Sequence, residues 1–300
     1  MSSLRKVLII SGPTATGKTA LAVEMAKRFN GELISADSRQ VYQEVKIGVG
    51  KDHPKNTTIH LIDLIATNEV FSVAKFQKLA FGAIEDIGAR GKLPIIVGGT
   101  GLYIDAIINP KYRTFEIKPN RFLRLILNNL PLRALQQILK LADNKTYRQL
   151  NNSDVNNPRR LIRKIEIKLA GEKNARLRNS DFDVLHLSLT AKNSVLYDRI
   201  DERVEERMKM GHLDELDRLI KRYDWNCPGL QAWAYQSFKN RYLGEETMTE
   251  AMEKWKRHEH GLARRQNTWF RKRGGKLIDI SQKDYQRKAM TAVEKWYNEP

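Results

Sequence analysis

The residues with the clearest chemical potential lie near the amino terminus, in the sequence KVLIISGPTATGKT at positions 6–19. Gly12 and Gly17 let the backbone curl so that successive N–H groups point at one anion. Lys18 adds a full positive charge, a helix that begins there adds its dipole, and the hydroxyl of Thr19 suits Mg²⁺. A site for a di- or triphosphate group is therefore predicted at Gly12, Pro13, Thr14, Ala15, Thr16, Gly17, Lys18 and Thr19.

The surroundings of this loop argue against a glycine-rich turn that matches by chance. An apolar run at positions 7–10 precedes it, and an alanine-rich helical pattern follows it. A strand, a loop and a helix in this order are what a phosphate-binding loop requires. The loop does not identify the molecule to which the phosphate is attached.

Asp37 directly follows a predicted strand, within the segment SADSRQ at positions 35–40. A carboxylate at that end of a strand lies opposite the phosphate loop, where it can hold a metal through water or accept a proton from a nucleophile. The same segment also suits the N-cap of a helix. The sequence leaves both interpretations open.

Two further segments carry candidate residues. Gly98-Gly99-Thr100-Gly101 ends another predicted strand, and Thr100 offers a hydroxyl there, although an ordinary turn explains the motif more simply. The segment RRQNTWFRKR at positions 264–273 interleaves basic and aromatic residues. Its arginines can neutralise phosphates, whereas Trp269 and Phe270 either stack on an unpaired base or, as we favour, face the core of a helix bundle.

The elements that position these loops alternate between strands and helices in residues 1–110. Such alternation predicts βαβ units and a parallel sheet, with ligands beyond the carboxyl ends of the strands. The loops 12–19, 36–40 and 98–101 should therefore meet. The expected strands are Val7–Ile10, Glu32–Ser35, His60–Ile65 and Leu93–Val97, and the expected helices are Lys18–Phe29, Val73–Gly88 and a segment after Gly101.

The second part of the chain has a different pattern. Residues 111–173 read as short helices between Asn- and Pro-rich breaks, which predicts a small all-α insertion outside the sheet. The core, residues 1–110 and 174–300, resumes with a strand at 183–189 and a long helix at 195–210. Further helices, a short strand at 276–280 and a last helix complete the expected α/β fold, a P-loop NTPase-like parallel sheet flanked by helices.

The charge is distributed unevenly along the 300 residues. The formal net charge is +18, of which residues 1–110 contribute only +3 and the remainder +15. A nearly neutral phosphate-loop half joined to a basic half predicts a small anionic ligand and a nucleic acid partner. A generic solvated surface is the alternative.

Composition also limits the class of protein. No apolar run approaches the roughly 20 residues that span a bilayer, and the amino terminus lacks the apolar stretch of a signal peptide. The single cysteine, Cys227, excludes an internal disulfide and a zinc site with two thiolates. We therefore expect a cytoplasmic protein with no membrane partner.

Several motifs together resemble the tRNA dimethylallyltransferase family, also called tRNA isopentenyltransferases, along nearly the whole chain. The phosphate loop is common to many kinases and ATPases, but ADSRQVY, GGTGLY and RQNTWF in this order are far more specific. The matching segments are GPTATGKT (12–19), ISADSRQVY (34–42), HLID (60–63), FSVAKFQ (71–77), GKLPIIVGGTGLY (91–103), NNPRRLIRKIE (156–166), LYDRIDERV (196–204), GHLDEL (211–216) and ARRQNTWFR (263–271).

The resemblance implies transfer of a dimethylallyl group from dimethylallyl diphosphate to N6 of the adenosine immediately 3′ of the anticodon in tRNA. Asp37 would hold or remove a proton of the N6 amine. Thr100 would lie beside the target nucleotide, and Mg²⁺ at Thr19 would bind the diphosphate. Lys18 and Arg199, the latter from LYDRID, would stabilise the leaving group. A monomer that binds the anticodon stem-loop is expected.

The resemblance also implies a set of tRNA contacts. Asn157, Ala234-Tyr235-Gln236 and Gly48–Asp52 depart from the usual family residues, so these contacts follow the family pattern less closely than the catalytic residues do. The implied contacts are Asp37, Ser38, Arg39, Gln40, Thr100, Arg124, Arg159, Arg160, Arg163, Tyr235, Arg264, Arg265 and Gln266.

Three other functions fit parts of the sequence. A small-molecule P-loop kinase would explain residues 1–110 but not the basic remainder. An adenylate isopentenyltransferase would use a free nucleotide as acceptor, which the basic carboxyl-terminal half disfavours. A nucleic-acid-binding ATPase without transfer chemistry is the third.

Overall fold

The computed structural model describes residues 5–51, 54, 57–109, 117, 119–171, 182–273 and 275–299. Residues 110–116, 118 and 172–173, which belong to the expected insertion or its edge, lie outside this described part. The chain divides into two compact units, Met1–Ile108 with Ser180–Pro300, and Asn109–Asn179. Each unit is considered by itself.

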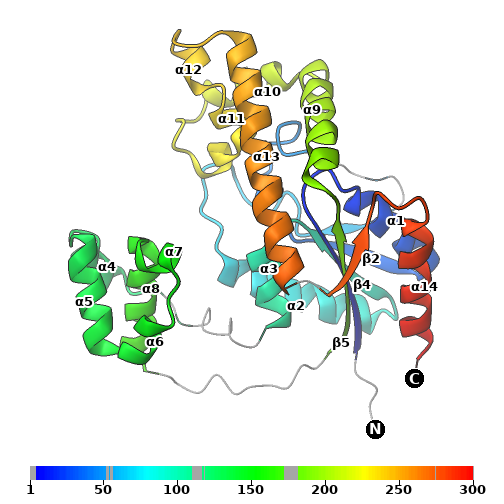
Figure 1. Cartoon of the computed structure of the whole chain (residues 1–300), viewed down its shortest axis with the longest axis horizontal. Coiled ribbons are helices and arrows are strands. Elements are labelled where there is room, and N and C mark those ends of the chain that lie inside the picture. Colours follow the sequence, from blue (N-terminus) through cyan, green and yellow to red (C-terminus); the bar gives the residue numbers. More distant parts are fainter. Residues whose placement is uncertain are drawn as a thin grey trace. The chain divides into compact units, whose positions relative to one another are not determined.

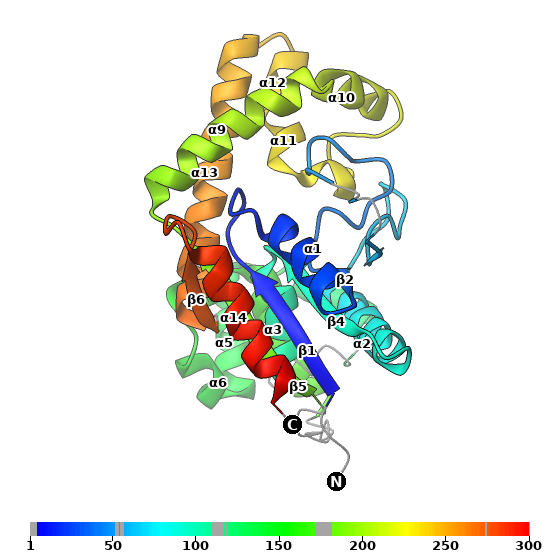
Figure 2. The same cartoon turned by 90° about the vertical axis from the view of Figure 1, so that its right-hand side faces the viewer.

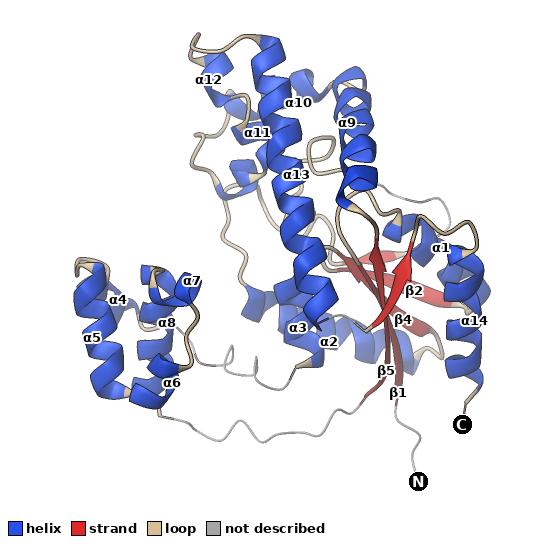
Figure 3. Cartoon of the chain, in the orientation of Figure 1, coloured by secondary structure: helices blue, strands red, loops and turns tan. Residues whose placement is uncertain are grey.

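The first unit is built on a parallel sheet (Figures 1 and 3). Its described strands follow the order β3-β2-β4-β1-β5-β6, so β1 has β4 on one side and β5 on the other. This arrangement confirms the predicted α/β fold and places the end of β1 at a point where chain connections diverge, the usual place for a ligand. The strands are β1 (Arg5–Ser11), β2 (Gly31–Ser35), β3 (Ile59–His60), β4 (Leu93–Gly98), β5 (Phe182–Thr190) and β6 (Lys276–Asp279).

Side chains of β1 alternate between two apolar cores, as the pleat of a strand requires. Leu8 and Ile10 pack with α1 (Lys18–Arg28), α9 (Asn193–Lys209) and α14 (Tyr285–Asn298). Val7 and Ile9 face the opposite core, with α2 (Val73–Ala89) and α3 (Gly101–Ile108). Because all four side chains are fully buried, β1 is anchored in the apolar cores on both faces of the sheet.

Helices of the carboxyl-terminal half extend beyond the end of β1 (Figure 2). Phe270, on the longest of them, is 2% exposed, and Trp269 packs against the same core, which confirms that these aromatic residues face inward. These helices are α10 (His212–Ile220), the 3₁₀ helix Pro228–Gln231, α11 (Trp233–Gln236), α12 (Lys239–Tyr242) and α13 (Met248–Arg273).

The strand expected at His60–Ile65 is wrong in extent. Only Ile59 and His60 pair with β2, and Ile65 forms a single isolated bridge. Leu61 and Asp63 have positive φ angles of 62° and 55°, a conformation that interrupts a strand. The Asp63 carboxylate accepts a hydrogen bond from Lys51 at 2.5 Å, so a tertiary contact accompanies this turn.

The second unit contains five helices among its described residues. Leu127, Leu135, Leu139, Leu161 and Ile165 form part of its own apolar core. Across the described chain, no helix is both long and apolar enough to cross a membrane. The helices are α4 (Arg121–Leu127), α5 (Leu132–Ala142), α6 (Asn144–Arg148), α7 (Asn152–Val155) and α8 (Pro158–Leu169).

Candidate active site

The phosphate loop links β1 to the first turn of α1. Ala15 and Gly17 have φ angles of 64° and 76°, and the Thr16 hydroxyl donates to the Pro13 carbonyl at 2.8 Å. A Cβ atom on Gly12 would lie 2.8 Å from the carbonyl oxygen of Leu189, so only glycine fits there. The backbone therefore has the curled form that an anion-binding loop needs.

Lys18 lies within this loop and donates to the Pro13 carbonyl at 3.0 Å. Burial of its ammonium, followed by repulsion from Arg203, lowers the pKa of Lys18 to about 8. Attraction from Asp37 and Glu259 opposes this decrease, which shows that both carboxylates lie within electrostatic range of Lys18. Because burial and repulsion disfavour the charged form of Lys18, an anion that binds beside it stabilises the ammonium.

Two arginines of α9 reach the same loop. Arg199 donates to the Ala15 carbonyl at 3.4 Å from an exposed position, and Arg203 donates to the Thr14 hydroxyl at 3.3 Å from a half-buried one. Sequence reasoning named Arg199 and missed Arg203. The available signal was its spacing, because residues four apart lie on one face of a helix.

The loops that follow β2 and β4 are joined directly. The Thr100 N–H donates to the Ala36 carbonyl at 3.2 Å, and the Thr100 hydroxyl accepts from the Ser38 N–H at 3.1 Å. One oxygen of Asp37 accepts from the Arg39 N–H at 2.8 Å. Asp37 thus caps a local turn, and this contact engages one of its two carboxylate oxygens.

Gln266 of α13 connects this pair of loops to the phosphate loop. Its side-chain oxygen accepts from the Thr14 N–H at 2.9 Å, and its amide nitrogen donates to the Gly99 carbonyl at 2.9 Å. All three loops expected at the carboxyl ends of the strands therefore form one site. In this structure the Gln266 side chain binds protein backbone at both ends of its amide.

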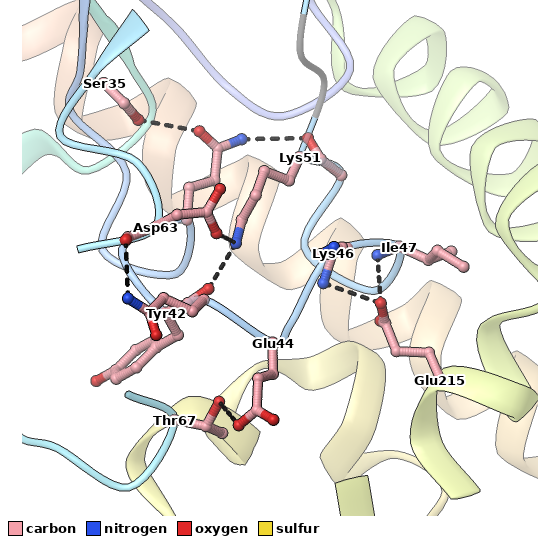
Figure 4. Close-up of polar contacts among 12 residues, drawn as sticks. Ser35, Tyr42, Glu44, Lys46, Ile47, Lys51, Asp63, Thr67 and Glu215 are labelled. Atoms are coloured by element: carbon pink, nitrogen blue, oxygen red, sulfur yellow. Dashed lines mark hydrogen bonds and ion pairs between the residues drawn. The ribbon is translucent and has the colours of Figure 1, made fainter. Parts of the chain in front are cut away.

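Arg39 and Gln40 also make contacts within the protein. Arg39 donates to the Pro228 carbonyl at 3.3 Å. The Gln40 amide accepts from the Ser35 hydroxyl at 2.9 Å and donates to the Gly50 carbonyl at 3.1 Å, within the network of Figure 4. These bonds fix the loop after β2 against the segment that ends at Lys51.

The expected contact of Tyr235 with tRNA requires correction. Its ring is 0% exposed, and its hydroxyl donates to Glu215 at 2.7 Å. Burial, together with Glu215, raises the pKa of Tyr235 well above the usual tyrosine range. Tyr235 therefore belongs to the core, and it presents no surface to a nucleic acid.

The arginines expected to bind tRNA in the helical unit differ in their surroundings. Arg124 forms two bonds to the buried carboxylate of Glu166, at 2.7 and 2.8 Å, and Arg163 contacts the same carboxylate at 3.3 Å. Arg160 is exposed and pairs with Asp154 at 2.5 Å, whereas Arg159 is exposed on the first turn of α8.

On α13, Arg264 and Arg265 are exposed, two and one residues before Gln266.

Thr19 is half-buried on the first turn of α1. Within the described ranges there is no group of three or more His, Cys, Asp or Glu side chains that could hold a metal. A Mg²⁺ ion bound by one hydroxyl and by phosphate oxygens fits this set of donors.

A comparison with protein-family models distinguishes among the classes of protein that use a phosphate-binding loop. The sequence model described as "IPP transferase" matches residues 40–273, which is most of the chain. The chain belongs to the IPP transferase family. This result confirms the resemblance predicted from the sequence motifs.

Named relatives agree with this family assignment. A tRNA dimethylallyltransferase from Roseiflexus sp. (strain RS-1) is 37% identical, and the alignment covers 97% of this chain and 98% of the relative. The structure of a tRNA isopentenylpyrophosphate transferase from Bacillus halodurans has 35% identity and a TM-score of 0.72, with 98% of each chain covered. A eukaryotic dimethylallyltransferase, described as acting on tRNA, has 27% identity and a TM-score of 0.84, with 99% of this chain and 80% of that chain covered.

Proposed function

We propose that this member of the IPP transferase family transfers a dimethylallyl group from dimethylallyl diphosphate to N6 of the adenosine immediately 3′ of the anticodon in tRNA. Diphosphate is the second product. The observation that carries the proposal is the Gln266 bridge, which joins an anion-binding loop to the loops of Asp37 and Thr100. A donor phosphate and an acceptor base need such adjoining sites.

The phosphate loop stabilises the leaving group. As the bond between carbon and oxygen breaks, negative charge grows on the diphosphate, and fixed N–H groups and cations at that position lower the barrier. Lys18 and Arg203 supply positive charge at the loop, and Arg199 supplies it from the exposed side. These contacts support catalytic roles for Lys18, Arg199 and Arg203.

Asp37 acts on the acceptor. The exocyclic N6 is a poor nucleophile because its lone pair is delocalised into the ring, so a base that takes one N6 proton as the carbon–nitrogen bond forms speeds attack. Thr100 helps to fix the Asp37 loop through its bond with Ser38. The base must leave its stack to reach these residues, as it does in other enzymes that modify bases.

Mg²⁺ fits the site as a cofactor. Thr19 would hold it together with the diphosphate oxygens, and the ion would neutralise part of the diphosphate charge. We further propose dimethylallyl diphosphate as the donor, a monomeric enzyme, and the cytoplasm as the compartment where tRNA is modified.

We propose that each of the two units carries its own contacts to tRNA. Exposed Arg264 and Arg265 of α13 and exposed Arg159 and Arg160 of α8 would bind backbone phosphates, which fits the basic charge of residues 111–300. Asp37, Ser38, Arg39, Gln40, Thr100 and Gln266 would lie around the extruded base. Arg124 and Arg163 would contribute to the tRNA-binding surface indirectly, because their bonds to Glu166 hold the helices that carry the exposed arginines.

A labelled-donor assay tests the proposal. The protein is incubated with dimethylallyl diphosphate labelled in the prenyl group and with either tRNA or adenosine monophosphate. Label in tRNA, lost when the target adenosine is replaced by guanosine, is the expected result. Label only in the mononucleotide would indicate an adenylate isopentenyltransferase, and label in neither would indicate a kinase or ATPase.

A further inference from the structure

Glu215 of α10 is a buried carboxylate with an unusual set of partners. It is 3% exposed, and it accepts hydrogen bonds from three successive backbone N–H groups, those of Lys46, Ile47 and Gly48, at 2.9, 2.9 and 3.0 Å. Figure 4 shows Glu215 beside Lys46 and Ile47. Tyr235 adds a fourth bond from its hydroxyl at 2.7 Å. An internal carboxylate thus fixes the loop 46–50.

The same loop lies against two arginines of α9. Arg207, which is buried, donates to the Gly48 carbonyl at 3.0 Å. Gly50 has a φ of 59°, and a Cβ atom on it would collide with the guanidinium groups of both Arg203 and Arg207. The backbone of Gly50 therefore packs directly against the guanidinium groups of Arg203 and Arg207.

Arg203 carries this contact to the phosphate loop. Its guanidinium donates to the Thr14 hydroxyl at 3.3 Å, and its charge is the second largest cause of the lowered pKa of Lys18. A continuous series of contacts thus runs from Glu215 through the loop 46–50 to Arg203 and then to Thr14. A long side chain such as arginine loses much rotamer freedom when it is held in this way.

We propose that Glu215 is a positioning residue for the diphosphate site, because it fixes the loop 46–50 and this loop holds the guanidinium of Arg203 at the phosphate loop. The proposal rests on the proposed function only in naming diphosphate as the anion. Glu215 itself touches neither substrate. Its effect on the reaction passes through Arg203, and this dependence separates it from a residue that only stabilises the fold.

A double-mutant cycle with inorganic pyrophosphate as the probe tests this dependence. Binding in the presence of Mg²⁺ is measured by calorimetry for wild type, Glu215→Gln, Arg203→Ala and the double variant. Glu215→Gln should weaken pyrophosphate binding by about 5- to 30-fold, whereas in the Arg203→Ala background it should change binding by less than about twofold. Equal losses in both backgrounds would overturn the proposal.

A matched control is available at the other end of the sheet. Glu32 is 4% exposed and binds Arg90, Lys92 and His60, so Glu32→Gln alters another buried, fully engaged carboxylate. It should lower the melting temperature without weakening pyrophosphate binding, and an equal loss of binding would contradict a specific role for Glu215.

Two further readouts complete the test. Tyr235→Phe removes only one bond to Glu215, so it gives a smaller effect of the same kind if Glu215→Gln does not fold. No effect of Tyr235→Phe in the wild-type background would then count against the proposal. If wild type binds pyrophosphate and the cycle shows coupling but no prenyl group reaches tRNA, the proposed function fails while the role of Glu215 stands.

Discussion

The side-chain oxygen of Gln266 accepts a hydrogen bond from the backbone N–H of Thr14 at 2.9 Å, across 252 residues of sequence. The other end of the same amide donates to Gly99. A Cβ atom on Gly99 would lie 2.6 Å from that nitrogen, so glycine is needed for the contact. One side chain thereby sets the separation between the loop that binds phosphate and the loops that surround the acceptor.

Gln266→Ala should lower kcat/KM by about 10- to 100-fold, because it takes the side-chain partner from the partly buried Thr14 N–H and Gly99 carbonyl and lets the loops separate. Steady-state kinetics with both substrates measure this. Thr268→Ala is the matched control, since Thr268 is exposed on the same helix and its hydroxyl bonds only to the Arg264 carbonyl among the described contacts. Equal kinetics for wild type and Gln266→Ala would remove the bridge from the mechanism.

Asp37 combines a turn cap with a proposed catalytic role, and two variants separate them. Asp37→Ala should slow the chemical step by about 10²- to 10⁴-fold, the usual worth of acid–base help, while tRNA affinity is nearly kept. Asp37→Asn keeps an oxygen that can accept from the Arg39 N–H but is not basic. Single-turnover rates of the two variants measure the chemical step. A rate near that of wild type for Asp37→Asn would mean that Asp37 only caps the turn and takes no part in catalysis.

The lowered pKa of Lys18 predicts a pH dependence of donor binding. Folding lowers this pKa from 10.5 to about 8, and only the protonated ammonium attracts diphosphate. The contribution of Lys18 to affinity should therefore be nearly constant below about pH 7, be halved near pH 8 and fall by about tenfold at pH 9, with proton uptake on binding that increases over the same range. Pyrophosphate titrations in buffers of different ionisation enthalpy measure both quantities.

Lys18→Arg provides the control for this effect, because a guanidinium stays charged throughout this range. Its affinity should be lower, because a planar guanidinium is not equivalent to a compact ammonium. Between about pH 7 and 9 its affinity should follow only the ionisation of pyrophosphate, so the difference between the two profiles reports Lys18. A wild-type profile as flat as that of Lys18→Arg would show that Lys18 does not titrate in this range.

The exposed arginines of α8 should make tRNA binding depend on salt. Replacing Arg159 and Arg160 with alanine should reduce the slope of log K against log salt by about one to two, without effect on donor binding. Arg159 should contribute more, because Arg160 also pairs with Asp154. Filter binding at several salt concentrations gives the slope.

Arg124→Ala serves as the contrasting variant in the same unit. It removes two bonds from Glu166, whose side chain is 1% exposed, so it should destabilise the unit by about 1–3 kcal/mol in thermal unfolding. The salt slope should change little. An unchanged slope for the Arg159 and Arg160 variant, or a larger change for Arg124→Ala, would mean that the phosphate contacts lie elsewhere.

The amino-acid sequence by itself determined the features that depend on residues close together in the chain. The phosphate loop needs only Gly12, Gly17, Lys18 and Thr19 at fixed spacing between an apolar strand and a helix. The parallel sheet followed from the alternation of strands and helices, and the family followed from motifs such as ADSRQVY and GGTGLY. Local geometry and burial periodicity suffice for the loop and the sheet, whereas the family rests on the resemblance of these motifs to those of known proteins.

Only the tertiary structure decided how distant segments meet. Arg203 reaches Thr14, Gln266 joins Thr14 to Gly99, and Glu215 fixes the loop 46–50 through contacts between residues separated by more than 150 positions. The same packing buried Tyr235, and it limited the strand expected at His60–Ile65 to Ile59–His60. A side chain's exposure and its partners depend on how helices pack on the sheet, and residue type and spacing do not encode that packing locally.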